Sequence, residues 1–508
     1  MAKYLLAHDI GTSGNKATLF SAEGSLIKSS TVSYGAHYFN GTWVEQEAED
    51  WWNAVCESSR RLIHSAGIDA KDIAAVSFSG QMMGCLCVDR EGNPLRPSII
   101  WADSRAQEQA RQIERKISQR EYYHISGHRN TASYGIQKLM WVRDHEPEIY
   151  KKTYKVLNAK DYIVLKLIGK FYTEPSDANS FGCFDLKEFQ WSDRILKCTG
   201  IDREKLLEIV PSTQVAGEVT RQAAEQTGLA EGTPVVMGGG DGVVANIGCG
   251  SIAPGKTYCC MGTSAWITTT TDQPVFDEEM RTVTWAHVIP GLYAPNGTMQ
   301  YAGGSYSWVK QVICTLETEQ AKQNGTSPYD EMNRLAKDCP IGSGGVIFLP
   351  YMLGERAPRW NPYAKGAWLG LRPENTRGDM VRSVLEGITM NLSICLDILR
   401  TKTGIEEITV VGGGAKSGVW QQIMADIYDA RIKVPRLLEE GGSMGAAVIG
   451  GVGVGIYPDF SAIERFMKID KVKEPDRESV EKYGQIKKTF EQYYSALKDV
   501  FGEIYRAG

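Results

Sequence analysis

The sequence predicts an α/β protein with two domains, and three observations lead to this class. The chain has 508 residues, which is too long for one ordinary hydrophobic core. Strand-like and helix-like segments alternate in both halves, as in layered α/β architectures. An apolar strand, a Gly-Thr-Ser turn and a second strand occur at residues 4–20 and again at 257–270. The repeat suggests two related halves, each of which begins a sheet at a turn of phosphate-binding size.

The alternation can be followed along the chain. Helical periodicity is present at residues 49–67, 101–118 and 377–404, where the last segment ends at a glycine. Strands are predicted at residues 73–81 and 408–415, and the second of these runs into a glycine turn. These elements support mixed layers of helix and sheet in both halves.

The C-terminal tail is predicted to form a charged amphipathic helix over residues 476–505, just after a proline. Its apolar stripe consists of Phe490, Tyr493, Leu497 and Phe501. We expect this helix to pack on the second domain.

We place the domain boundary near residue 250, which gives domains of residues 1–250 and 251–508. The boundary follows the glycine-rich segment GGGDGVVANIGCG, and no low-complexity linker marks it. We therefore expect an extensive interface between the domains.

Composition limits the classes of partner. The net charge of −5 argues against a polyanionic partner such as nucleic acid. There is no run of about 18 apolar residues that could span a membrane, and the N-terminus does not resemble a signal peptide. The 11 cysteines show no repeated C-x-x-C spacing, so we expect reduced, buried thiols rather than a structural metal site. A cytoplasmic location follows from these features.

The first candidate site is the turn after the first predicted strand, Asp9-Ile10-Gly11-Thr12-Ser13-Gly14. A tight Gly/Thr/Ser turn presents backbone N–H groups and hydroxyls to phosphate oxygens, and an adjacent Asp suits a hydrated Mg²⁺. Lys16 adds a positive charge nearby. The alternative is a plain hairpin in which the Asp and Thr side chains bond their own backbone.

The second candidate is Asp241, which follows Gly238, Gly239 and Gly240 at the end of an apolar strand. The glycines leave little side-chain bulk, so a substrate can approach the carboxylate closely. An Asp in this position can accept the proton of an attacking hydroxyl. The alternative is a helix N-cap, because a helix-compatible segment follows.

The third candidate is the glycine turn Gly412-Gly413-Gly414-Ala415, which links a strand to a helix. Bare backbone allows a flat purine and its ribose to lie against it. The alternative is a close helix–strand crossing that needs glycine for packing. Gly303 and Gly304 form a weaker candidate of the same kind.

Together these elements resemble the actin/hexokinase-like ATPases, and within that group the FGGY carbohydrate kinases over essentially the whole chain. Residues 366–386 fit the family's C-terminal signature in full. The N-terminal signature is met in large part by Lys138 to Val142, but Gly135 stands where Pro, Ser or Thr is usual. The segment FLPYMLGERAPRWNP at 348–362 and the Trp51-Trp52 pair are also similar to the family.

Several residues resemble those of the xylulokinases in particular: Trp43, Glu45, Gln46, Gly80, Gln81, Met82, Trp101, Asp103 and Arg105. The resemblance implies a sugar site that includes Gln81, Met82, Met83, Trp101 and Asp103. One residue departs from the pattern, because Met83 stands where bacterial xylulokinases carry a histidine. A thioether cannot replace the hydrogen bond of an imidazole to a sugar hydroxyl, so the sugar can differ.

The resemblance also implies the remaining roles. Asp241 is the expected catalytic base and Asp9 the expected metal-side carboxylate. Residues expected to bind ATP are Thr12, Ser13, Lys16, Gly262, Thr263, Gly303, Gly304, Gly413, Gly414 and Ala415. The implied fold is two actin/hexokinase-like, or ribonuclease H-like, domains around a cleft that closes over the substrates.

The expected activity is transfer of the γ-phosphate of ATP, with Mg²⁺, to a free sugar, D-xylulose first of all. Another ketose, a sugar acid or a polyol is the alternative within the enzyme class. A sugar sensor without activity, or a chaperone-like ATPase, is the alternative outside it. Retention of Asp241 in its glycine setting favours the enzyme. A homodimer is compatible with the sequence.

Overall fold

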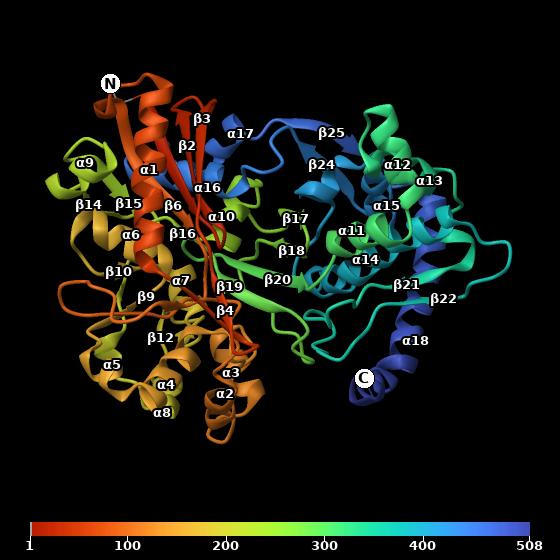
Figure 1. Ribbon diagram of the computed structural model, residues 1–508, viewed down its shortest axis with the longest axis horizontal. Helices are drawn as coiled ribbons and strands as arrows, with labels where there is room; N and C mark the ends of the chain where they lie inside the picture. Colours follow the sequence, from red (N-terminus) through yellow and green to blue (C-terminus); the bar gives the residue numbers. More distant parts are fainter. Residues whose placement is uncertain (1–2, 508) are drawn as a thin grey trace.

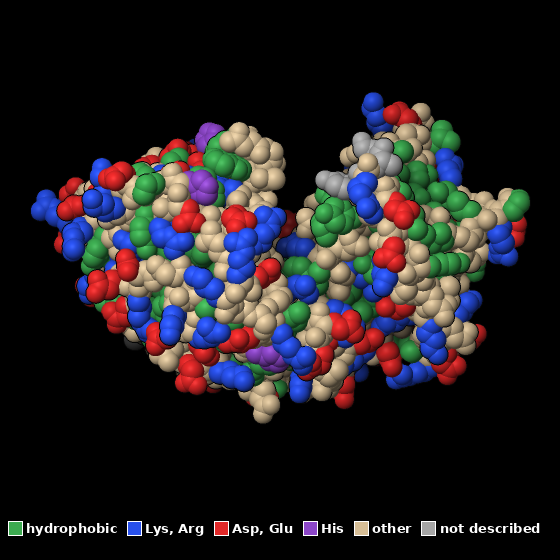
Figure 2. Space-filling view, turned by 90° about the horizontal axis from the view of Figure 1, so that it is seen from below, with side chains coloured by type: hydrophobic (Ala, Val, Ile, Leu, Met, Phe, Trp, Pro, Cys, Tyr) green, Lys and Arg blue, Asp and Glu red, His purple; other side chains and the backbone are tan. Residues whose placement is uncertain are grey.

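The computed structural model describes residues 3–507 as two lobes, each built around a twisted sheet (Figure 1). In space-filling view a deep notch separates the lobes (Figure 2). The predicted two-domain α/β class is therefore confirmed. The order of the first sheet is β14 (Val215–Glu218), β15 (Pro234–Val236), β6 (Ile73–Gly80), β1 (Tyr4–Ile10), β2 (Gly14–Ser21) and β3 (Leu26–Ser33), with β16 (Gly239–Gly240) also paired to β6.

The second sheet repeats this plan. Its order is β19 (Val283–Ala286), β20 (Tyr293–Met299), β18 (Ala265–Thr269), β17 (Thr257–Met261), β23 (Glu407–Val411), β24 (Arg431–Pro435) and β25 (Ile469–Lys473). Both sheets contain a central antiparallel hairpin, β1–β2 in the first and β17–β18 in the second. The first strand of each hairpin pairs in parallel with a third strand, β6 or β23, which pairs in parallel with a fourth, β15 or β24. The edge strand beyond, β14 or β25, is antiparallel to its neighbour. The duplication suggested by the two Gly-Thr-Ser turns is thus present in the topology.

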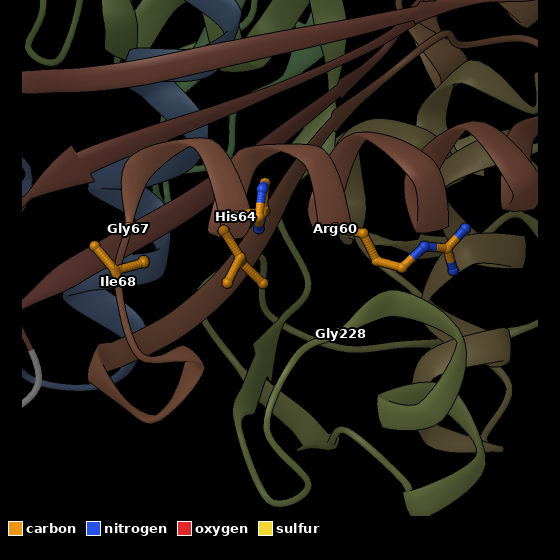
Figure 3. A pocket seen from close by; sticks show the side chains of 6 residues that line it. Arg60, His64, Gly67, Ile68 and Gly228 are labelled. Carbon is orange, nitrogen blue, oxygen red and sulfur yellow. The ribbon is translucent and has the colours of Figure 1, made fainter.

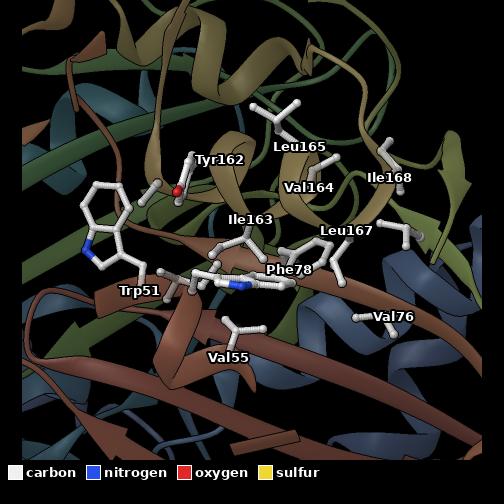
Figure 4. Packing of buried hydrophobic residues seen from close by; sticks show 14 of the residues in the cluster. Trp51, Val55, Val76, Phe78, Tyr162, Ile163, Val164, Leu165, Leu167 and Ile168 are labelled. Carbon is white, nitrogen blue, oxygen red and sulfur yellow. The ribbon is translucent and has the colours of Figure 1, made fainter. Parts of the chain in front are cut away.

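Helices cover both faces of the first sheet. One face packs against α1 (Ala48–Ala66) and α6 (Ala159–Ile168), where Trp51, Phe78 and Ile163 belong to one buried cluster (Figure 4). The other face packs against α10 (Asp241–Gly248) and α16 (Gly441–Gly453). Side chains of successive strand residues point to opposite faces, so the alternation of Leu5 and Leu6 between the two clusters follows from strand geometry.

The helix α16 comes from the second half of the sequence but packs on the first sheet. It contacts β1, β6 and α10, and the short α17 (Ile463–Phe466) follows it there. The crossing with α10 is close, since a side chain on Gly248 would overlap the carbonyl oxygen of Gly441. The expected boundary near residue 250 falls in the loop between α10 and β17, and the chain crosses back to the first lobe after β24.

In the second lobe α14 (Arg377–Arg400) packs on β18 and β20, beside α15 (Gly418–Tyr428). The tail helix is α18 (Arg477–Ala507), which contacts α14, α15 and β21 (Ile347–Leu349). Its predicted apolar stripe lies in one cluster with residues of this lobe: Phe490, Tyr493, Leu497 and Phe501. The predicted docking of the tail on the second domain is confirmed. Within residues 3–507, no helix is long and apolar enough to cross a membrane.

One predicted helix is much shorter than expected. The helical pattern at 101–118 becomes α2 (Gln107–Glu114), and residues 101–106 form a turn. The Asp103 carboxylate accepts hydrogen bonds from the backbone and side-chain nitrogens of Arg105. This local bonding competes with helix formation and explains the late helix start.

The remaining elements fill the periphery of the two lobes. In the first lobe they are β4 (His37–Phe39), β5 (Trp43–Gln46), β7 (Leu86–Val88), β8 (Ser98–Ile99), α3 (Gln119–Ser126), α4 (Gly135–His145), α5 (Pro147–Lys152), β9 (Lys155–Leu157), β10 (Tyr172–Thr173), α7 (Pro175–Ser180), β11 (Phe184–Asp185), β12 (Gln190–Trp191), α8 (Asp193–Thr199), β13 (Glu208–Ile209) and α9 (Arg221–Thr227). In the second they are α11 (Gly303–Val312), α12 (Thr315–Asn324), α13 (Pro328–Lys337) and β22 (Ala367–Leu369).

Candidate active site

Two carboxylates stand at the same edge of the first sheet. The strands β1, β6 and β16 run parallel, with Asp9 opposite Ser79 and Gly240 opposite Gly80. The carboxyl ends of these strands therefore meet, and Asp9 and Asp241 lie on either side of β6. Neighbouring strands are about 4.8 Å apart, so the two backbone positions are separated by roughly 10 Å.

Asp241 is the first residue of α10, and Gly240 rather than Asp241 is the N-cap. The helix-capping alternative for Asp241 is therefore excluded. Its Oδ1 accepts the adjacent Gly242 N–H at 2.7 Å. The side chain is open to solvent but lies deep within the protein mass. This desolvation, followed by the negative charge of Asp9, raises the pKa of Asp241 to about 7, against the lowering effect of the Gly242 amide. A carboxyl with this pKa is suited to proton transfer near neutral pH.

Asp9 is the next-to-last residue of β1 and lies beside a hydroxyl. The Ser79 hydroxyl donates to its Oδ1 at 2.7 Å, and burial raises the pKa of Asp9 while the Ser79 hydroxyl and the Lys16 ammonium act in the opposite direction. Residues 3–507 contain no cluster of three or more His, Cys, Asp or Glu side chains able to hold a metal. One carboxylate fits an Mg²⁺ whose other ligands are phosphate oxygens and waters.

The two Gly-Thr-Ser turns differ in their support. The first turn is held by Trp101, whose Nε1 donates to the Thr12 hydroxyl at 2.9 Å, while Ser13 is exposed. The second turn, with Thr263 exposed, is held by the start of α11, where the Gly303 N–H donates to the Gly262 carbonyl at 3.0 Å.

The glycines at the start of α11 thus serve the turn itself. Gly304 N–H donates to the Thr263 carbonyl at 3.1 Å, and a side chain on Gly303 would meet the Gly262 oxygen at 2.4 Å. A side chain on Gly304 would likewise meet the Tyr301 ring at 2.2 Å, so packing supplies a structural reason for both glycines. A contact of either with a nucleotide stays a prediction.

Lys16 has a protein partner in this structure. Its Nζ lies 2.5 Å from Glu440 Oε1 and donates to the Glu439 carbonyl at 3.1 Å. The ammonium therefore joins β2 to the segment just before α16. Phosphate binding by Lys16 would require exchange of these contacts.

The third glycine turn is open at one position. Gly412 has φ of 85°, which favours glycine, and a short 3₁₀ turn follows from Gly413 to Lys416. Nothing lies within 4 Å of a side chain built on Gly413, whereas one on Gly414 would press on Met261 and Trp420. Ala415 is buried. Gly413 is thus the member of the trio that faces free space, and Gly414 is needed for packing.

The loop after β6 carries the predicted sugar residues. Gln81 is buried and its amide donates to Gln46 Oε1 at 2.8 Å, so it fixes the loop. The Met82 side chain packs on Gly240, where a side chain would meet its sulfur at 2.7 Å. Met83 has φ of 60°, and its N–H donates to the Ser180 hydroxyl at 3.1 Å. The loop therefore places the Met82 thioether beside the strand that leads to Asp241.

Asp103 does not face the cleft, contrary to its predicted contact with the sugar. The side chain is fully buried, and its carboxylate accepts from Val44 N–H at 2.6 Å and from the Arg105 guanidinium at 2.7 Å. Both oxygens are occupied by these partners. Asp103 therefore supports the turn that carries Trp101, which itself is exposed.

The structure brings in residues that sequence patterns did not single out. The Ser79 hydroxyl donates to Asp9, and the Ser176 hydroxyl oxygen accepts the Gly240 N–H just before Asp241. The Tyr258 hydroxyl donates to the Gly242 carbonyl at 3.1 Å. These contacts join segments far apart in sequence. Only the polar residue Ser79 within an apolar strand carried a signal that could have been noticed.

Lys138 and Gly135, from the N-terminal signature, support the sugar loop. The buried Lys138 Nζ donates to the carbonyls of Met83 and Ile100, each at 2.8 Å. A side chain on Gly135 would meet the Phe181 ring at 2.2 Å. The local packing explains why this chain carries glycine where the family usually has Pro, Ser or Thr.

A separate surface pocket of about 360 Å³ lies between α1 and the end of α9 (Figure 3). Its lining consists of Arg60, Ile63, His64, Gly67, Ile68 and Gly228. It contains no predicted site residue and no carboxylate, so it does not compete with the cleft as a site for phosphoryl transfer.

Models of the FGGY family of carbohydrate kinases match the chain twice, the N-terminal domain at residues 4–248 and the C-terminal domain at 257–454. The chain belongs to the FGGY family of carbohydrate kinases. It is 30% identical to a gluconokinase of Bacillus subtilis over 506 residues, which covers 99% of this chain and 98% of that protein. It is 33% identical to a xylulose kinase of Staphylococcus epidermidis over 504 residues, covering 98% of each.

Solved structures agree with this assignment. A ligand-bound xylulose kinase from Lactobacillus acidophilus has a TM-score of 0.91 at 26% identity and covers 99% of this chain and 100% of its own. A gluconate kinase from the same organism has the same score and identity, covering 99% of each chain. The FGGY kinase described here is therefore an ATP-dependent phosphotransferase with an alcohol acceptor, and the resemblance inferred from sequence is confirmed.

Proposed function

We propose that this FGGY kinase transfers the γ-phosphate of ATP to D-xylulose, giving D-xylulose 5-phosphate, with Asp241 as the general base. The observation that carries the proposal is the Asp241 carboxyl, which is open to the cleft and has a pKa raised to about 7. In its deprotonated form it accepts the proton of the attacking hydroxyl. The xylulose kinases among the relatives support this choice of sugar.

The residues of the chain supply three further parts of the reaction. Thr12, which is half-buried in the first turn, and Thr263, which is exposed in the second, offer donors for charge that develops on the phosphoryl group. Asp9 would hold a phosphate-bound Mg²⁺, which neutralises phosphate charge when bound. Gly413, with free space around it, would lie against the adenosine. The enzyme acts in the cytoplasm under this proposal.

A second candidate substrate is a sugar acid such as D-gluconate. The gluconokinases among the relatives are as similar overall as the xylulose kinases, and Met83 lacks the imidazole that the xylulokinase pattern supplies. A specific observation also favours it. Burial raises the pKa of the Tyr134 hydroxyl, and the nearby Arg356 guanidinium acts in the opposite direction. Within residues 3–507 the Arg356 Nε is buried and has no hydrogen-bond partner. A partly buried, unpaired guanidinium is a natural partner for a carboxylate.

One assay separates the candidates. ADP release is measured with D-xylulose, other ketoses, polyols and D-gluconate, for the wild type and for Arg356→Gln. A preference for D-xylulose that Arg356→Gln leaves unchanged supports the first proposal. A preference for D-gluconate whose KM rises only for the acid in Arg356→Gln supports the second. ADP release that no sugar stimulates would contradict both and favour a sensor.

A further inference from the structure

The backbone that leads to Asp241 consists of three glycines, of which Gly239 and Gly240 form β16 and pair with β6. Gly238, Gly239 and Gly240 precede the carboxylate, and glycine has the largest conformational freedom of any residue. The glycines are required, because a side chain on Gly238 would meet the Phe78 carbonyl at 2.1 Å and one on Gly240 the Met82 side chain at 2.6 Å. Because glycines have no side chains that could hold this segment, its backbone contacts with neighbouring elements fix the position of Asp241.

One anchor is Ser176, in the short helix α7. Its hydroxyl oxygen accepts the Gly240 N–H at 2.9 Å, one residue before Asp241. The same hydroxyl donates its proton to Glu174 Oε1 at 2.6 Å. A hydroxyl has one proton, so once that proton is committed to the carboxylate, only lone pairs face Gly240. Glu174 thus fixes Ser176 as an acceptor.

Glu174 is held rigidly for this task. The side chain is completely buried, and its oxygens also accept from Ser176 N–H, from Asp177 N–H and from the Ser212 hydroxyl, at 3.0, 2.8 and 2.7 Å. Four donors thus converge on this carboxylate, and its oxygens act as acceptors in every one of these hydrogen bonds. In the hydrogen-bonded chain that joins Glu174, Ser176 and Gly240, the Ser176 hydroxyl therefore donates to Glu174 and accepts from Gly240.

We propose that Glu174 and Ser176 are positioning residues for the base, holding the Gly240 amide and through it the Asp241 carboxylate in the geometry for proton transfer. The inference rests on the proposed role of Asp241. It assigns a function in turnover to a buried carboxylate that does not touch a substrate. A second anchor, the Tyr258 hydroxyl on Gly242, comes from the other lobe.

Ser212 offers a matched control. Ser176 and Ser212 are both buried, and each donates one hydroxyl hydrogen bond to Glu174, but only the Ser176 hydroxyl contacts Gly240. Ser176→Ala and Ser212→Ala therefore remove the same group and the same type of bond. Steady-state kinetics and amide hydrogen exchange of the Gly240 segment are measured for both, with thermal unfolding to compare their stability.

We expect Ser176→Ala to lower kcat by about 10- to 100-fold, as for a misplaced reacting group, with the KM values for ATP and sugar unchanged and faster exchange of the Gly240 amide. Ser212→Ala should change neither kcat nor this exchange. Glu174→Gln, which retains side-chain size, should behave as Ser176→Ala. Equal kcat in the two serine variants would overturn the inference. It would also be overturned if Ser176→Ala exchanged the Gly240 amide faster but kept the kcat of the wild type.

The failure of this inference is distinguishable from failure of the proposed base. If Asp241→Asn abolishes turnover while Ser176→Ala matches Ser212→Ala, the anchoring role alone is wrong. If Asp241→Asn retains turnover, the base is wrong and the positioning role falls with it.

Discussion

The two sheets have the same strand order and direction but different residues where equivalent strands end. Both β1 and β17 lead into Gly-Thr-Ser, and two residues before the glycine the first has Asp9 and the second Cys260. Burial raises the pKa of the Cys260 thiol to about 12, so this position is neutral near pH 7. The repeated scaffold thus carries a carboxylate in one lobe only.

The next pair of equivalent strands, β6 and β23, differs in the size of the side chains that follow each strand. Gly80 lies opposite Ile10 at the end of β6, and Gly412 follows Val411, which lies opposite Cys260, at the end of β23. After these equivalent glycines the first lobe has Gln81-Met82-Met83 and the second has Gly413-Gly414-Ala415. We infer that this position of the repeated fold supplies side chains for sugar contacts in the first lobe. In the second lobe it supplies bare backbone for a purine.

The largest expected effect is at the third equivalent position, where Asp241 begins α10 and Gly441 begins α16. Asp241→Asn should lose about 10²- to 10⁴-fold in kcat, the usual contribution of a general base, because the amide cannot accept the proton. Calorimetry should show that ATP and sugar still bind. Turnover within a factor of ten of the wild type would remove Asp241 from the role of base.

The next effect tests the Asp9–Cys260 difference. Asp9→Asn should weaken the apparent affinity for Mg²⁺ by about 10- to 100-fold, as measured from the Mg²⁺ dependence of kcat, because a neutral amide is a poor partner for the ion or its waters. Cys260→Ser, at the equivalent position, is the control and should leave the Mg²⁺ dependence unchanged. Equal Mg²⁺ dependence in both variants would mean that the two turns do not differ in this respect.

Topology was largely predictable from sequence, and the site only in part. The apolar periodicity of β1, β6 and α18 predicted these elements, because each buries a face defined by its own sequence. The helix predicted at residues 101–118 was wrong over its first turns, because the Asp103 carboxylate accepts the Arg105 N–H there. The return of α16 to the first sheet and the contact of Ser176 with Gly240 depend on tertiary packing, which no local pattern encodes.

A smaller effect is expected on the nucleotide side. Gly413→Val should raise the KM for ATP about tenfold, or ~1.4 kcal/mol, and leave the KM for sugar unchanged, because its side chain enters free space rather than the core. Gly404→Val, also in open space in the same lobe, should change neither value. A higher KM for sugar in Gly413→Val would contradict the assignment of this turn to the purine.

The smallest effect concerns Met83. Met83→His should shift the ratio of kcat/KM values toward D-xylulose by about 2- to 10-fold, the equivalent of one net hydrogen bond of 0.5–1.5 kcal/mol. Met82→Leu, which removes a thioether without adding a donor, serves as the control. A wild type that already prefers D-xylulose a hundredfold over the other sugars would show that Met83 has no bearing on specificity.

The pH dependence of kcat/KM tests the central claim, that Asp241 is a base with a raised pKa, most directly. A base acts when deprotonated, so a pKa of about 7 predicts that kcat/KM is constant above this pH and falls about tenfold per unit below it. A profile that stays flat down to about pH 5, as for a carboxyl with an ordinary pKa near 4, would contradict the account.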